Sequence, residues 1–170
     1  LLNWSSFDRL NLDEAQNKID AINTRFENLK NIQNVFLHCF YDSKKTDFNF
    51  KKLTSNTKIN ISRYNYFYAS YLVSTGKVEK ARKVLETSLK LYPRNLLINQ
   101  YKLDLNEDNF DNNFNCKKQS DVVAEILYIT ANALSSQSIY NFSNFFLNLA
   151  KYLNNDFHSF NTLLAENFYK

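Results

Sequence analysis

The sequence predicts an all-α fold, and three observations support this prediction. The 170 residues include one glycine and one proline, Gly76 and Pro93, which excludes glycine-rich phosphate loops and turn-rich β-sandwiches. Apolar residues recur at steps of three and four along most of the chain, which is the period of an amphipathic helix. Hydrophobic residues make up 44% of the chain and aromatic residues 16%, so a core of ordinary domain size can be buried.

Predicted helices follow one another along the chain. The clearest apolar stripes cover residues 12–26, 29–40, 78–92, 142–153 and 157–168. Further helices are predicted within 62–75, at 96–105, and after Ser120 or Asp121, either of which can serve as an N-cap. The stretch 48–61 is weaker, and 58–61 could instead be extended.

Two residues and one polar stretch mark the ends of these helices. Gly76 can adopt a positive φ after the helix that ends near residue 75. Pro93 cannot continue the helix that ends near residue 91. Residues 106–119 are polar and lack apolar spacing, which predicts a flexible loop. The predicted map is therefore an N-terminal helical region (1–105), a loop (106–120) and a C-terminal helical region (121–170).

Residues 62–95 form the clearest repeat unit. Small residues stand where two helices would cross, at Ala69 in the first helix and at Ala81 and Ser88 in the second, and they let the helix axes approach closely. Gly76 takes the turn and Pro93 closes the unit. The pattern closely resembles the tetratricopeptide (TPR) motif, which repeats about every 34 residues.

A second copy of the motif begins near residue 124. Its small positions are Ala131, Ser143 and Ala150, whereas Ser138 replaces the turn glycine and Asn155 replaces the closing proline. A further first helix follows at the C-terminal end.

Partial copies are expected elsewhere, which resembles irregular bacterial TPR proteins. Residues 12–22 resemble the second helix of a copy whose start is cut off, and 29–57 could be a degenerate copy in which Phe50 stands where Ala is usual. The resemblance implies a right-handed superhelix, or α-solenoid, of antiparallel helix pairs.

The resemblance also implies a concave face, lined by the first helix of each pair, that binds protein segments. The positions that match in this chain define a candidate peptide groove of eight residues: Arg63, Tyr66, Ser70, Ser74, Glu125, Tyr128, Asn132 and Ser136. Tyr66 and Tyr128 are the expected aromatic anchors, and the alternative is that both cover the seam between repeats. The family's carboxylate-clamping groove uses Lys and Asn at such positions. Only Asn132 matches, so that specificity is not predicted.

The resemblance favours two functions for this chain. One is a protein–protein interaction module that binds a protein or peptide segment on a concave helical surface. The alternative is an architectural helical-repeat section of a larger protein or assembly, which recruits nothing. A third class, binding of single-stranded nucleic acid, rests only on the basic stretch 77–94 and the tyrosines, and the net charge of only +4 disfavours it. We interpret that basic stretch as a solvated helix face.

No residue pattern points to catalysis, so the chain is not expected to be an enzyme or to hold a cofactor or metal. His38 and His158 belong to no metal-ligand or catalytic spacing. The adjacent Asp13 and Glu14 suit the first turn of a helix better than a catalytic carboxylate pair, because neighbours on a helix do not face each other.

The two cysteines give no disulfide framework and no zinc spacing. Cys39 falls in an apolar helical stripe, which predicts a small buried side chain. Cys116 falls in the polar stretch, which argues against pairing with Cys39. This reasoning leaves the redox compartment open, with a lean towards a reducing one.

No apolar run is long enough to span a membrane and no signal peptide is visible, so a soluble, cytoplasmic protein is expected. The chain begins at Leu1 rather than Met, so an upstream signal could be missing. The first motif looks cut inside its opening helix, and Trp4 is therefore expected to lack its usual neighbours. Self-association through uncapped ends is a further expectation.

Overall fold

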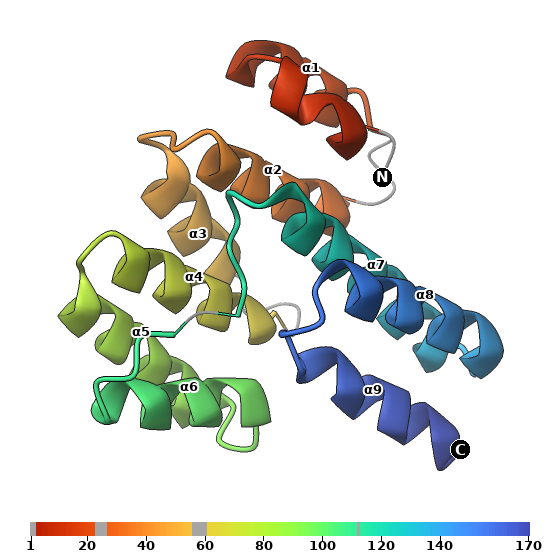
Figure 1. Ribbon diagram of the computed structural model, residues 1–170. Coiled ribbons are helices and arrows are strands. Elements are labelled where there is room, and N and C mark those ends of the chain that lie inside the picture. Colours follow the sequence, from red (N-terminus) through yellow and green to blue (C-terminus); the bar gives the residue numbers. More distant parts are fainter. Residues whose placement is uncertain (1–2, 23–26, 56–60, 112) are drawn as a thin grey trace. The chain divides into compact units, whose positions relative to one another are not determined.

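The computed structural model describes residues 3–22, 27–55, 61–111 and 113–170, and all regular structure among them is helical (Figure 1). The predicted all-α class is therefore confirmed. In chain order the elements are a 3-10 helix η1 (Trp4–Arg9) and the α-helices α1 (Leu12–Asp20), α2 (Glu27–Phe40), α3 (Thr46–Thr54), α4 (Arg63–Ser74), α5 (Val78–Leu91), α6 (Leu96–Asn106), α7 (Gln119–Ser136), α8 (Tyr140–Leu153) and α9 (Ser159–Phe168). The prediction that 58–61 is extended falls mostly outside the described residues.

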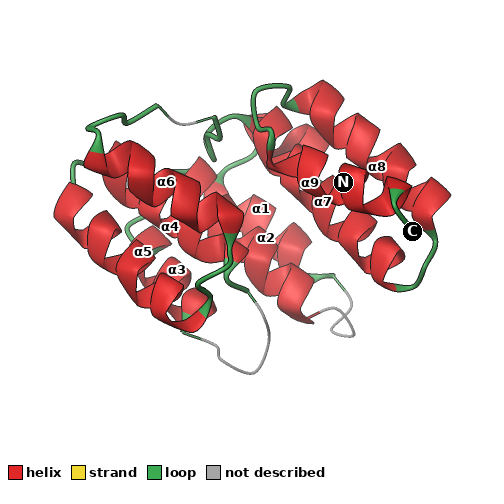
Figure 2. Cartoon of the chain, turned by 90° about the horizontal axis from the view of Figure 1, so that it is seen from below, coloured by secondary structure: helices red, strands yellow, loops and turns green. Residues whose placement is uncertain are grey.

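The chain forms two compact units. The α2–α6 unit comprises Ile22–Asn112, and the α7–α9 unit comprises Asn113–Lys170 together with Leu1–Ala21. Within each unit a helix packs against its neighbours in sequence, and α4 also contacts α6 as α7 contacts α9 (Figure 2). The first helices therefore belong with the last ones, whereas the predicted map grouped them with the N-terminal region.

The two predicted repeat copies share one turn geometry. After α4, Gly76 has φ +75°, its N–H donates to Val73 O at 2.9 Å, and the next N–H donates to Leu72 O at 2.8 Å. After α7, Ser138 has φ +63° and makes the equivalent bond to Ser135 O at 2.9 Å. Serine therefore adopts the left-handed conformation that glycine adopts more easily.

The small residues predicted at helix crossings are buried. Ala69 and Ala81 have no exposed surface, and the same holds for Ala131 and Ser143 in the second copy. The Ser143 hydroxyl donates a hydrogen bond to the backbone oxygen of Ala131 at 2.8 Å, so these two positions touch. Because any larger side chain would hold the backbones apart, α7 and α8 approach closely at this point.

A buried polar network ties α9 to the pair α7 and α8. Asn167 on α9 accepts a hydrogen bond from Ser135 Oγ at 2.6 Å and donates one to Ser143 Oγ at 2.8 Å. Its amide also donates to Asn144 Oδ1 at 2.8 Å. Since a buried amide without partners is costly, this network fixes the orientation of α9.

The N-terminal segment is better covered than the sequence suggested. Trp4 and Phe7 are fully buried, with ring centroids 4.8 Å apart, and η1 packs against α7. Gln119 on α7 donates a hydrogen bond to the backbone oxygen of Trp4. The expectation that Trp4 lacks neighbours is therefore wrong, because α7 supplies them from a distant part of the sequence.

The acidic residues of α1 act as a cap, as predicted. Asn11 Oδ1 accepts from the Glu14 backbone N–H at 3.0 Å, and the Glu14 carboxylate accepts from the Asn11 N–H at 3.1 Å. This reciprocal pair is a capping box, and it satisfies two backbone donors that the first turn would otherwise leave unbonded.

Two further sequence interpretations need correction. The stretch between α6 and α7 is non-helical, as predicted, but Phe114 within it is buried with its ring 5.9 Å from that of Phe157. The predicted flexibility of this loop stays a prediction. Cys39 is buried as expected, yet neither Cys39 nor Cys116 is a free thiol. The expectation of unpaired cysteines is therefore wrong, because spacing and polarity in a sequence do not determine whether a thiol is oxidised.

We predict that Ala131→Leu destabilises the protein by about 1 to 3 kcal/mol, because a larger side chain must push α7 and α8 apart. The matched control is Ala133→Leu, two residues away on the exposed face of α7. Its effect should stay within about 0.5 kcal/mol. Urea denaturation of both variants measures the difference, and equal midpoints would contradict the close crossing.

We also predict that Gly76→Ala costs about 1 kcal/mol, because alanine is strained at positive φ. A Cβ on Gly76 would meet no atom within 4 Å, so the backbone conformation alone sets the cost. Ser138→Ala should be close to neutral, since Ser138 already bears that strain. Thermal melts of the two variants provide the comparison, and an equal loss in both would show that the turns differ.

Candidate functional site

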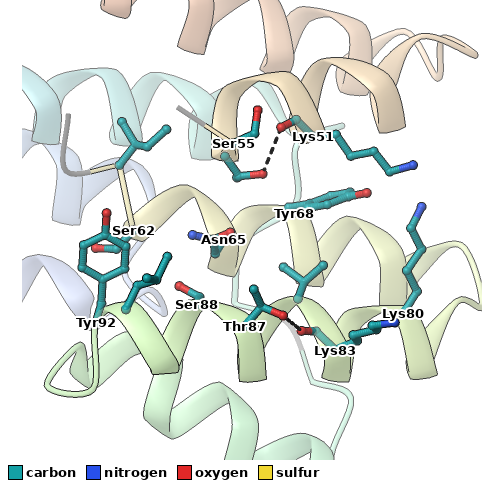
Figure 3. Close-up of a pocket in the computed structure, with 14 residues that line it drawn as sticks. Lys51, Ser55, Ser62, Asn65, Tyr68, Lys80, Lys83, Thr87, Ser88 and Tyr92 are labelled. Carbon is teal, nitrogen blue, oxygen red and sulfur yellow. Dashed lines mark hydrogen bonds between the residues drawn. The ribbon is translucent and has the colours of Figure 1, made fainter. Parts of the chain in front are cut away.

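A cavity of about 380 Å³ lies within the α2–α6 unit, bordered by α3, α4 and α5 (Figure 3). We call it the α3–α5 pocket. The side chains of Lys51 and Lys80 lie at one end of the pocket, near the Tyr68 hydroxyl, and Tyr92 lies at the other end. Asn65 and Ser88 lie between them. The pocket therefore has a basic end, a polar middle and an aromatic end.

One edge of α5 forms a wall of the pocket. Its lining residues recur at the helical period, and they are Lys80, Lys83, Val84, Thr87, Ser88 and Leu91. The neighbouring face of α5, with Ala81 and Leu85, is fully buried. Since residues three and four apart lie on one side of a helix, the core face of α5 fixes which side chains line the pocket.

Asp47 on α3 organises the basic end. Its Oδ1 accepts hydrogen bonds from Lys80 Nζ at 2.6 Å and from the Tyr68 hydroxyl at 2.9 Å, and Lys51 Nζ lies 3.2 Å from Oδ2. Burial by itself raises the pKa of this carboxyl. The hydrogen bonds from Lys80, Tyr68 and Lys51 outweigh burial and lower the pKa from 3.8 to about 2. One carboxylate thus links α3, α4 and α5.

Tyr68 is a rigid part of the pocket. The residue is 2% exposed, its ring stacks on that of Phe50 at 5.4 Å, and Lys80 Nζ lies 5.7 Å from the ring centroid. Burial, together with the hydrogen bond to Asp47, raises the pKa of the Tyr68 hydroxyl. Phe50, which stands where the resemblance predicts alanine, is therefore accommodated by aromatic stacking.

Polar side chains from α4 and α5 line the pocket without a partner among the described residues. The Ser88 hydroxyl is buried and makes no hydrogen bond. The Asn65 side-chain amide makes none either, and no described carboxylate lies within ion-pair distance of Lys83. Only the Ser88 hydroxyl is buried, and a buried polar group without a partner costs free energy, so this hydroxyl favours a bound partner. Asn65 is half-buried and Lys83 is exposed, so both also face solvent.

The groove candidates of α4 lie elsewhere and are mostly covered. Tyr66 is 5% exposed, with its ring centroid 4.9 Å from that of Tyr101 on α6. Ser70 is also buried, whereas Ser74 is exposed. The Arg63 guanidinium lies 5.5 Å from the ring centroid of Phe67. Tyr66 thus occupies the seam between α4 and α6, which is the alternative stated for it.

The other four groove candidates lie on α7, in the other unit. Glu125 is fully buried, and Tyr128 is half-buried with its ring 5.7 Å from that of Phe160 on α9. Asn132 and Ser136 are exposed. The eight candidates are therefore divided between the two units, and none of them lines the α3–α5 pocket.

Sequence reasoning missed the pocket although a signal was present. Lys80 and Lys83 belong to the basic stretch that we interpreted as a solvated face. The charge of Arg82 in that stretch is paired, since its guanidinium donates a hydrogen bond to the Asp108 carboxylate at 3.2 Å. The charge of Lys83 has no such partner among the described residues. Asp47 and Lys80 on α5 are 33 positions apart in the sequence, and no sequence pattern predicts the hydrogen bond between them.

No group of three or more His, Cys, Asp or Glu side chains that could hold a metal occurs within 3–22, 27–55, 61–111 and 113–170. None of the helices in these ranges is long and apolar enough to cross a membrane. Comparison with models of known protein families, with curated proteins and with solved structures gives no match.

We predict a pH-dependent stability difference between the wild type and Asp47→Asn. A lowered pKa means that the carboxylate stabilises the fold above pH 4 and that this contribution is lost as pH falls towards 2. The wild type should be more stable by about 1 to 2 kcal/mol at pH 7, and the difference should vanish near pH 2.

Tyr68→Phe is the matched control, because it keeps the ring and removes one hydrogen bond to Asp47. It should show the same direction of pH dependence with a smaller amplitude. Guanidinium denaturation between pH 2 and pH 7 gives both curves. A difference for Asp47→Asn that stays constant over this range would contradict the assigned role of Asp47.

Proposed function

We propose that this chain is a helical-repeat module of the TPR-like, solenoid type that binds a protein or peptide segment, and that the α3–α5 pocket is its binding site. The observation that carries the proposal is the set of unpartnered polar groups at Asn65, Lys83 and Ser88, which line one pocket. Buried hydroxyl groups in folded proteins normally have a hydrogen-bond partner, and a bound peptide would supply one to Ser88.

The repeat-like build supports the module class. The turns at Gly76 and Ser138 use equivalent backbone hydrogen bonds, and both follow helices with a buried alanine at the crossing position. Helix pairs of this kind present long exposed edges and short turns, which suit recognition of extended segments.

The titratable groups of the pocket suit binding rather than proton transfer. Asp47 has its pKa lowered to about 2, and the pKa of Tyr68 is raised. Both groups therefore hold one protonation state near neutral pH, whereas a general acid or base works best with a pKa close to the operating pH. They act as fixed charges and dipoles that hold Lys51 and Lys80 in place.

A second candidate function is architectural, and an apolar face of α8 favours it. Phe142, Phe145, Leu149 and Tyr152 recur at helical spacing and are 62%, 56%, 38% and 86% exposed. An exposed apolar stripe of this kind marks a surface for packing against another protein or domain. In that case α8, and not the pocket, would carry the contacts.

A photo-crosslinking experiment separates the two functions. Benzoylphenylalanine is placed at Leu91, which lines the pocket and is 63% exposed, or at Phe145 on α8, which is 56% exposed. The proposal predicts a discrete crosslinked peptide segment from the native lysate at Leu91, lost when Lys83→Glu is added. Crosslinks confined to Phe145 would contradict it and favour the architectural function.

A further inference from the structure

The α3–α5 pocket carries an excess of positive charge. Lys51, Lys80 and Lys83 line it, whereas Asp47 is the carboxylate that pairs with the first two. Three ammonium groups against one carboxylate leave a net positive charge at this end. Lys83 has no ion-pair partner among the described residues, so it is available to a ligand carboxylate.

The middle of the pocket matches the polar atoms of a peptide backbone. The Asn65 amide offers both a donor and an acceptor, and the Ser88 hydroxyl can do either. Figure 3 shows Ser88 on α5 and Asn65 on α4 facing the same space. A peptide unit presents one N–H and one C=O, so it satisfies both side chains without adding charge.

The far end of the pocket is apolar. Leu91 is 63% exposed, and Ile61 and Tyr92 lie beside it in the pocket wall. At a rise of about 1.5 Å per residue, Lys83 and Leu91 are about 12 Å apart along the axis of α5. An extended peptide covers this distance in about three to four residues.

From these observations we infer that the pocket binds an extended acidic peptide segment. Its Asp or Glu carboxylate pairs with Lys83 and Lys80, its backbone bonds to Asn65 and Ser88, and an apolar side chain three to four residues away packs on Leu91 and Tyr92. This inference rests on the proposed function and names the chemistry of the partner. It uses a different face of α4 from Tyr66 and Ser70.

A polynucleotide fits these observations less well. The other basic residues of the stretch do not line the pocket, and they are Lys77, Arg82, Lys90 and Arg94. The pocket therefore has no continuous basic track for a phosphate backbone.

The test uses the full chain and a peptide array. Each array peptide has a fixed Glu and a fixed Leu two, three or four positions apart, with mixtures elsewhere, and matched peptides carry Gln, Lys or phosphoserine in place of Glu. We expect the Glu peptides with a spacing of three or four to bind more strongly than the Gln or Lys peptides, and no less strongly than the phosphoserine peptides. Binding of the best peptide should weaken as salt is raised.

Variants then assign the binding to the pocket. Lys83→Gln should weaken the affinity for the best Glu peptide about threefold, because one partly exposed ion pair is lost. Lys90→Gln, on the same helix but outside the pocket, should leave the affinity unchanged.

The outcomes separate the inference from the proposed function. The acidic-peptide inference would be overturned if Glu and Gln peptides bound equally well, or if Lys83→Gln and Lys90→Gln had equal effects. The crosslinking result at Leu91 would then still decide the proposed function. An array on which no peptide binds would also overturn it. Tighter, Lys83-dependent binding of a 20-nucleotide mixed-sequence RNA, used as a competitor, would replace it with nucleic-acid binding.

Discussion

Close approach of paired helices at small residues is the constraint on which the rest of this structure depends. Ala131 and Ser143 touch through a 2.8 Å hydrogen bond, and Ala69 and Ala81 are as fully buried in the other unit. A methyl or hydroxymethyl group at each crossing sets the separation of the helix axes, and larger residues around it fill the remaining space. The Asn167 network then fixes the orientation of α9 against this pair in the α7–α9 unit.

The pocket is a consequence of the same packing. Because Ala81 and Leu85 bury one face of α5, the adjacent edge with Lys83, Ser88 and Leu91 must line the space beside α3 and α4. Asp47 then holds three successive helices at that space through hydrogen bonds to lysine and tyrosine. The Ser88 hydroxyl stays without a partner there, and exposed apolar side chains line one edge of α8.

Local features of the fold could be predicted from the sequence, and features that depend on distant segments could not. Gly76 and the small residues at the crossings follow from helix periodicity and backbone sterics. The burial of Trp4 depends on α7, and the burial of Tyr66 depends on α6, so the helical period alone could place each residue on a face but could not identify what covers it. The pocket was missed for the same reason, since Asp47 and Lys80 meet only in the folded chain.

The most direct test of the central constraint is a disulfide cross-link across the pair α4 and α5. Ala69→Cys combined with Ala81→Cys should form the cross-link in high yield under mild oxidation, because a disulfide needs Cα atoms about 4.4 to 6.8 Å apart. Ala69→Cys combined with Glu79→Cys is the control, since Glu79 points away from the core on the same helix. Peptide mapping without reduction measures both yields. A cross-link in the first variant alone is the predicted result, and equal or absent cross-linking in the two variants would contradict the close crossing.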